Sequence, residues 1–240
     1  MLISLKRTAK ATLLGLGLMG FASNQADAGV IVSYEAAGVQ ASTMSGVITE
    51  TFDELKPGSF SSIKTLGGTL SGLPSFEVVK ADEFGGAGGT GNYFAVGAQS
   101  GTTAAALSFQ LTNPQTYFGF WFSAIDSRNS VELLSAGNVV ETLSAATVDS
   151  SLSSAYNGNP NSGADSGEKF AFVNFTATGD TTFDQIRFMN ASTATGFEAD
   201  NFTIKGTSVP EPSSIVMASI GGLIAAGSWV RTRRRAGVNA

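Results

Sequence analysis

Short runs in which apolar and polar residues alternate recur along the middle of the chain. A period of two residues is typical of strands that bury one face. Clusters rich in Gly, Asn, Ser and Asp separate the runs, such as GGAGGTG (85–91) and YNGNPNSGADSG (156–167), and they favour turns. The pattern predicts ten strands, over residues 30–35, 75–80, 92–97, 105–111, 116–125, 130–135, 138–144, 169–177, 182–190 and 196–205.

These strands predict one all-β domain, an antiparallel, jelly-roll-like β-sandwich over residues 29–208. Residues 36–74 carry a weaker strand pattern and predict either a flexible insertion or a short helix. The clearest hairpin is SVELLSAGNVVETLS (130–144), whose turn residues Gly137 and Asn138 accept a positive φ.

The stretch TYFGFWFSAI (116–125) is aromatic on both faces, which is typical of a central strand. Alternation points Phe118, Phe120 and Phe122 into the core. Tyr117 and Trp121 then lie on the second face, where a sugar ring could stack on them. The alternative is that a neighbouring loop covers both rings.

Residues 1–28 have the three parts of a secretory signal peptide. A basic start precedes the apolar run ATLLGLGLMGFA (11–22), and the small residues ADA (26–28) follow. We expect signal peptidase to cut between Ala28 and Gly29, which exports the protein. An uncleaved anchor is the alternative, but about 12 helical residues rise only about 18 Å, too short for a bilayer core of about 30 Å.

A second apolar segment, the 16 uncharged residues from Ile215 to Val230, lies near the C-terminus. It predicts a single transmembrane helix of about 24 Å, slightly short of a bilayer core. Pro210 and Pro212 prevent an earlier start and keep Glu211 extended. A basic membrane stop on the cytoplasmic side follows the helix: Arg231, Arg233, Arg234 and Arg235.

Three segments follow one another at this end of the chain: VPEPSS, the apolar helix with internal glycines, and RTRRR. Their order resembles the PEP-CTERM sorting signal of exported proteins from Gram-negative bacteria that make extracellular polysaccharide. The resemblance implies that an exosortase, a transpeptidase-like membrane enzyme, recognises Pro210, Glu211 and Pro212 and then releases the protein or transfers it to the surface. The sorting signal spans 209–235, and a short tail covers 236–240. An ordinary single-span tail anchor is the alternative.

The domain itself also resembles a group of exosortase-dependent surface proteins. The likeness covers most of residues 85–204 and is carried by GGAGGTGNYFAVG, YFGFWFSAIDSRN, YNGNP, FAFVNF and GFEADNFTI. It implies a β-sandwich at the cell envelope or outside the cell, and it implies no substrate.

Composition removes several classes of chemistry. The chain has no Cys and no His, which excludes disulfides, thiol nucleophiles, the usual zinc ligands and a His-based serine triad. Residues 29–208 hold seven of the 14 Lys and Arg residues and 17 of the 19 Asp and Glu residues, a formal charge of −10, which argues against binding nucleic acid.

We therefore expect a non-enzymatic surface or matrix protein within an exopolysaccharide-rich biofilm or envelope. Its partners would be signal peptidase, the exosortase and, as a transient anchor, the inner membrane. The alternative is a carbohydrate-binding module that recognises the matrix polysaccharide.

The last predicted strand, GFEADNFTIK (196–205), carries two carboxylates. Strict alternation puts Glu198 and Asp200 on the face of Phe202 and Ile204, so Asp200 would point into the core. A buried carboxylate needs a cation, an arginine or several backbone N–H groups.

A structural calcium ion is one solution, because Ca²⁺ takes six to eight oxygen ligands and an acidic domain without His or Cys offers only hard ligands. The alternative is an Asp bonded to loop amides. Glu198 and Asp200 could also serve as a glycosidase pair, but nothing else in the chain supports that reading. The candidate calcium ligands are Asp200, Glu198, Asp53 and Glu50.

Two loops are candidate binding elements. GGAGGTG (85–91) lacks the Lys and Ser/Thr of a phosphate loop, which favours a simple connection. The loop AIDSRNS (124–130) holds Asp126, Arg128 and Asn129, which predict a local ion pair or Asx turn, with ligand contact as the alternative.

Overall fold

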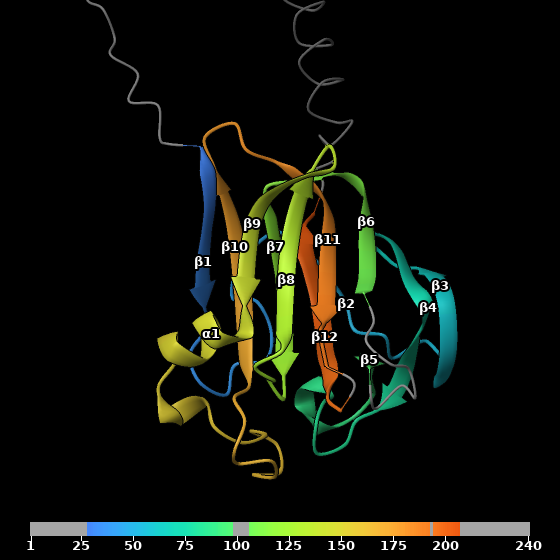
Figure 1. Cartoon of the computed structure of the whole chain (residues 1–240), viewed down its shortest axis with the longest axis vertical. Helices are drawn as coiled ribbons and strands as arrows, with labels where there is room; N and C mark the ends of the chain where they lie inside the picture. Colours follow the sequence, from blue (N-terminus) through green and yellow to red (C-terminus); the bar gives the residue numbers. More distant parts are fainter. Residues whose placement is uncertain (1–27, 98–105, 193, 207–240) are drawn as a thin grey trace, which may run out of the picture.

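The computed structural model describes residues 28–97, 106–192 and 194–206 (Figure 1). This part of the chain contains one α-helix, α1 (Ala145–Ser151), and the 3-10 turns η1 (Ala87–Gly89) and η3 (Ser154–Tyr156). It also contains twelve strands, which are β1 (Gly29–Tyr34), β2 (Val47–Glu50), β3 (Gly58–Lys64), β4 (Gly68–Lys80), β5 (Asn92–Gly97), β6 (Ala106–Gln115), β7 (Tyr117–Ser123), β8 (Asn129–Ser135), β9 (Asn138–Ser144), β10 (Ala171–Thr178), β11 (Phe183–Asn190) and β12 (Gly196–Lys205).

The prediction of an all-β, antiparallel domain is confirmed, and each of the ten predicted strands is present. The interpretation of residues 36–74 is wrong, because they hold β2, β3 and the first half of β4. β3 pairs with β4 alone and exposes most of its residues to solvent. A strand with one partner and one covered face needs few apolar residues, so its pattern is weak.

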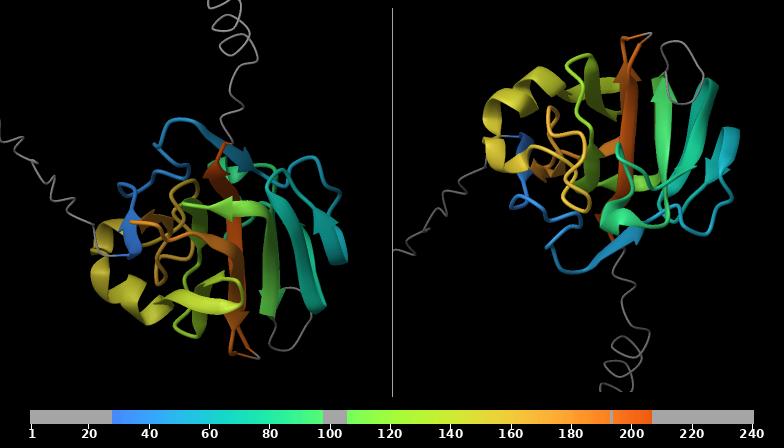
Figure 2. Two further views of the ribbon diagram at one scale, coloured as in Figure 1. Left: turned by 90° about the horizontal axis from the view of Figure 1, so that it is seen from above. Right: turned by 90° about the horizontal axis from the view of Figure 1, so that it is seen from below.

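All described strands belong to a single sheet, in the order β1-β10-β7-β12-β5-β4-β6-β11-β8-β9, with β2 added to β12 and β3 to β4. The sheet curls until its edge strands β1 and β9 contact each other, so it is nearly a closed barrel (Figures 1 and 2). The predicted sandwich of two sheets is thus one continuous sheet whose halves face each other across the core.

The core is built from phenylalanine, of which the chain has 17. Phe202 on β12 lies at its centre, with its ring centroid 5.0–6.2 Å from six other rings. Aromatic pairs at such distances add to the free energy of apolar burial. The six rings are those of Phe52, Phe94, Phe109, Phe118, Phe120 and Phe188.

β7 is the central strand that its aromatic pattern predicts. It lies between β10 and β12, and all seven of its residues are buried. Phe118, Phe120 and Phe122 belong to the core, as expected. Gly119 is required on the other face, since a Cβ there would lie 2.6 Å from the Tyr117 hydroxyl and 2.7 Å from the Phe172 ring.

The predicted hairpin is present as β8 and β9. Its turn is one position earlier than expected, because Ala136 and Gly137 adopt positive φ angles of 48° and 81°. Asn138 is the first residue of β9.

The sheet has two distinct ends. Gly29 pairs with Thr178 at the end of β10, and Ile204 pairs with Phe118 near the start of β7. The start of β1 and the end of β12 therefore lie at the same end, which is the upper one in Figure 1 and is called here the terminal pole. At the opposite end, the loop pole, β7 ends and β10 and β12 begin.

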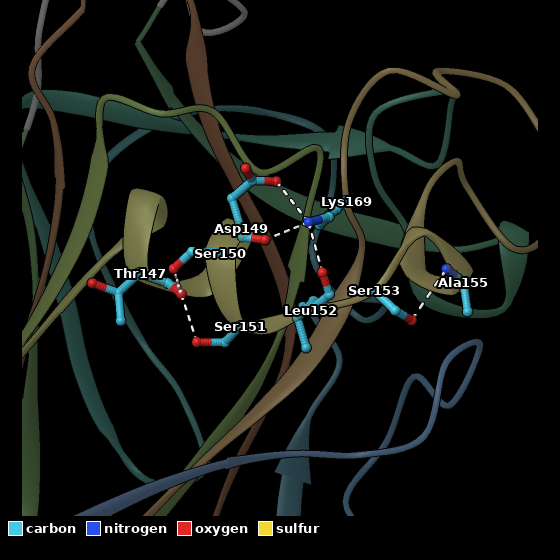
Figure 3. Close-up of polar contacts among 8 residues, drawn as sticks. All are labelled: Thr147, Asp149, Ser150, Ser151, Leu152, Ser153, Ala155 and Lys169. Atoms are coloured by element: carbon cyan, nitrogen blue, oxygen red, sulfur yellow. Dashed lines mark hydrogen bonds and ion pairs between the residues drawn. The ribbon is translucent and has the colours of Figure 1, made fainter.

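Lys169, just before β10, fastens helix α1 to the sheet (Figure 3). Its ammonium group donates to the carbonyl oxygens of Asp149 and Leu152, the latter at 2.9 Å, and forms a 2.9 Å ion pair with the Asp149 carboxylate. A cation at a helix C-terminus satisfies carbonyls that have no partner within the helix. At the other end, the Ser144 hydroxyl caps the helix by accepting from the Thr147 N–H.

No helix within the described ranges is long and apolar enough to cross a membrane. The predicted signal peptide, except for Ala28, and the predicted apolar helix (215–230) lie outside these ranges, as do the candidate sorting residues 210–212 and the Arg cluster (231–235).

Gly119→Ala should destabilise the protein by about 1–3 kcal/mol, because its methyl group would overpack against Tyr117 and Phe172. Urea unfolding monitored by circular dichroism measures the change. Gly167→Ala is the matched control, since a Cβ there meets nothing within 4 Å. Equal stability of the two variants would contradict the packing described for β7.

Lys169→Met should lower the free energy of unfolding by about 1–2 kcal/mol, because the side chain is only 14% exposed and its hydrogen bonds to two helix carbonyls are lost. Lys64→Met, on the edge strand β3, removes an exposed ammonium and should change stability little. Hydrogen exchange of the α1 amides should accelerate only in the first variant; unchanged exchange would show that Lys169 does not hold the helix.

Candidate functional site

A β-bulge in β12 decides where its two carboxylates point. The register of β12 against β7 shifts between Asp200 and Thr203, and Asn201 at the shift has a φ of +51°. The extra residue reverses the alternation, as bulges do. Glu198 and Asp200 pair with Ser123 and Trp121, whose side chains lie on the face opposite the core.

The prediction that Glu198 and Asp200 share the face of Phe202 and Ile204 is therefore wrong. Phe202 and Ile204 enter the core, but so does Ala199, which precedes the bulge. Asp200 is instead covered by the loop around η1.

Backbone amides of that loop and of the bulge bind both oxygens of Asp200. Oδ2 accepts from the Ala87 N–H at 2.8 Å, and Oδ1 accepts from the Asn201 N–H at 2.6 Å. Burial raises the pKa of Asp200 to about 7, although these amides lower it; Asp53 and Glu50 add a smaller upward contribution. This is the predicted alternative to calcium, an Asp bonded to loop amides.

The four candidate calcium ligands are not assembled as one group. Asp53 accepts from the Asn92 N–H at 2.8 Å, and Glu50 accepts from the N–H groups of Phe52 and Leu66, each at 3.1 Å. Glu198 lies with a different set of carboxylates. Across the described ranges, no three or more Asp, Glu, His or Cys side chains form a group that could hold a metal ion.

Tyr117 and Trp121 lie on the second face, as predicted, but both are only 1% exposed. The Tyr117 hydroxyl donates to Asn174 Oδ1 at 2.6 Å and lies 2.6 Å from the Ser42 hydroxyl. Trp121 packs against Phe170 under Phe84. The two rings are thus covered by neighbouring segments and offer no face on which a sugar could stack, which corrects their assignment as glycan contacts.

A concavity lined by acidic residues lies at the loop pole and is called here the acidic pocket. It has a volume of about 240 Å³. Three carboxylates line it: Asp126 after the end of β7, Glu168 before β10, and Glu198 near the start of β12. The remaining wall is formed by Phe84, Ala124, Ala194, Thr195 and Gly196.

Burial and mutual repulsion keep these carboxyls from ionising readily. Burial first, and then the charges of Asp126 and Glu168, raise the pKa of Glu198 to about 9. Burial, the adjacent Asp165 carboxyl and the charge of Asp126 raise the pKa of Glu168 to about 8. Burial also raises the pKa of Asp126. A pocket with such groups is a candidate functional site.

Sequence reasoning found part of this pocket. The sequence predicts Glu198 as a calcium ligand, and it predicts a local ion pair or Asx turn at Asp126, with ligand contact as the alternative. A backbone turn is present, because the Asn129 N–H donates to the main-chain carbonyl of Asp126 at 3.0 Å, and this is not the predicted Asx turn, in which the Asp126 side chain would accept. The ion pairs of the described residues do not include Asp126 or Arg128. Glu168 was missed; its only signal is the acidic loop DSGEK (165–169) before a strong strand pattern.

Comparison with solved structures shows a structural likeness. The fold is similar to the K2 cleaved adhesin domain of Lys-gingipain (Kgp), with a TM-score of 0.41 and 13% identity, over 66% of this chain and 98% of that chain. No protein-family model matches the chain, and no curated protein matches it significantly. The likeness is too weak to support an argument about function.

Stability should fall as pH rises from about 5 to about 9. The pKa of Glu198 is higher in the folded state, about 9, than its ordinary value of 4.5, so folding binds a proton throughout this interval. One such group lowers the free energy of unfolding by up to about 1.4 kcal/mol per pH unit. Glu168, whose pKa is also raised, lowers stability in the same direction.

Glu198→Gln should remove the contribution of Glu198 to the pH dependence of stability, because an amide that does not titrate replaces the carboxyl. Urea unfolding at pH 5, 7 and 9 should show the variant gaining on the wild type as pH rises. Glu54→Gln, at an exposed turn position, is the control and should follow the wild-type profile. Parallel profiles for all three proteins would show that Glu198 is not a buried member of an acidic pocket.

Proposed function

We propose that the protein is a non-enzymatic, exported cell-surface or extracellular-matrix protein. Signal peptidase removes residues 1–28, and an exosortase recognises Pro210, Glu211 and Pro212 in the sorting signal. The apolar helix and its four arginines serve as a transient inner-membrane anchor. The β-domain is the part that remains after processing, in an exopolysaccharide-associated envelope or matrix.

The observation that carries this proposal is the position of the two ends of the domain. β1 begins at Gly29, the residue after the expected signal-peptide cut, and β12 ends at Lys205, four residues before the sorting signal begins. Both lie at the terminal pole. Cutting the chain on either side would leave the whole sheet intact, and a C-terminal anchor would direct the loop pole away from the membrane.

Composition supports a role without catalysis. A chain that lacks His and Cys cannot build the commonest nucleophile and general-base pairs. The buried rings of Tyr117 and Trp121 give no support to the alternative of a carbohydrate-binding module that uses them.

The intact mass of the protein from its native host tests the proposal. We expect the surface wash or medium to contain a species that begins at Gly29 and ends between Pro210 and Ser213, with or without an added group. Changing Pro210 and Pro212 together to Ala should trap a longer membrane-bound form, because the recognition motif is lost.

Pro160→Ala, in an exposed loop of the domain, is the matched control and should be processed normally. A mature species that still carries Arg235 would show a permanent anchor and would rule out exosortase processing.

A further inference from the structure

The acidic pocket lies at the pole opposite both chain ends. Its carboxylates come from segments far apart in sequence, brought together because β7 pairs with β10 on one side and with β12 on the other. The view from the loop pole shows the loops that surround this end of the sheet (Figure 2). A domain anchored at its C-terminus would therefore present the pocket outward.

Glu198 is the most buried of the three carboxylates that line the pocket. Its side chain is 2% exposed, and a Cβ on Gly196 would lie only 1.9 Å from its Oε1 atom, so the neighbouring backbone confines it. The Oε2 atom of Glu198 is buried and has no hydrogen-bond partner. The same is true of the Oδ2 atom of the nearby Asp165. Buried oxygens without donors are costly, and a ligand that supplies N–H groups would satisfy them.

No ion pair of the described residues joins a cation to these carboxylates, and the nearby Arg128 is exposed. The two ion pairs of the described residues join Lys169 to Asp149 and Arg187 to Glu132, and neither includes a residue of the pocket. Lys169 follows Glu168 in sequence, but its ammonium is engaged by helix α1. A cation that stabilises the ionised form of these carboxyls would therefore come from outside the described residues.

The geometry also limits the kind of cation. The carboxylates do not form a group that could hold a metal ion. A guanidinium group suits them better, because its five N–H donors form a planar fork that can bind several carboxylates at once. The apolar wall of Phe84, Ala124 and Ala194 suits the methylene stem of an arginine, and an aromatic ring favours a nearby cation.

We propose that the acidic pocket binds the guanidinium group of an arginine side chain on a partner protein, with Glu198, Glu168 and Asp126 as its hydrogen-bond acceptors. This proposal does not depend on how the chain ends are processed.

The titration of the pocket supports this assignment. The carboxyl groups that interact with Glu198 are those of Asp82, Asp126, Asp165 and Glu168, and their charges raise its pKa. A bound guanidinium offsets this repulsion and favours the ionised carboxylates, so binding releases protons. Affinity should therefore rise between pH 6 and pH 9.

The test is a calorimetric titration of the full chain in detergent with N-acetyl-arginine amide at pH 8 and low ionic strength. N-acetyl-citrulline amide is the matched probe, because its urea group has nearly the same shape and no charge. We expect heat of binding for the arginine probe and none for the citrulline probe.

Glu198→Gln and, separately, Asp126→Asn should weaken binding by about tenfold or more, the loss expected for one charge-assisted hydrogen bond. Asp126 is partly exposed, so the second variant keeps the test decisive if the first folds poorly. Asp180→Asn is the control, since it removes the same charge at an exposed position beyond the end of β10, on the terminal pole.

Three results would overturn the proposal: no binding of the arginine probe, equal binding of the citrulline probe, or an affinity unchanged by both pocket variants. Tight binding of Ca²⁺ that abolishes arginine binding and is lost in Glu198→Gln would also overturn it, since the pocket would then be a metal site.

Discussion

The arrangement of this domain depends on one backbone irregularity, the bulge at Asn201 in β12. The bulge reverses the side-chain alternation, so that Ala199 before it and Phe202 after it both enter the core. Phe202 can then pack at the centre of the phenylalanine cluster, while Glu198 and Asp200 remain on the other face. A regular strand could not satisfy both demands, because a carboxylate would have to replace an apolar side chain in the core.

The bulge also marks a change of neighbours. Before it β12 pairs with β5, and after it β12 pairs with β2, while β7 follows β12 along the other side. The half of β12 next to β5 carries the carboxylates at the loop pole, and the half next to β2 ends at the terminal pole. One strand thus connects the acidic pocket to the end of the domain where the chain would be anchored.

Most of the fold could be predicted from alternation alone, because ten strands bury one or both faces and carry clear apolar patterns. The edge strand β3 could not, since one partner and open solvent allow Ser and Lys at its exposed positions. The two side-chain faces of β7 were predicted correctly, because β7 has no bulge. Those of β12 were predicted wrongly, because the positive φ of Asn201 leaves no signal in an apolar pattern of period two.

The acidic pocket was only partly predictable for a different reason. Glu168 and Glu198 are 30 positions apart, and only the pairing of β10 and β12 with β7 brings them to one cavity. No local pattern records that pairing. Trp121 is likewise buried by long-range contacts, with Phe170 and the loop before η1. The sequence alone could therefore not decide whether its ring is covered or exposed.

The most direct test of the bulged arrangement of β12 is a measurement of the pKa of the Glu198 carboxyl. ¹³C NMR of the side chain gives this pKa, and the Glu198→Gln variant assigns the resonance. We expect a midpoint near pH 9, because the bulge holds Glu198 in a buried pocket among other carboxylates. A midpoint near the ordinary value of 4.5 would show that Glu198 is solvated, and would contradict both the bulge's effect and the pocket it creates.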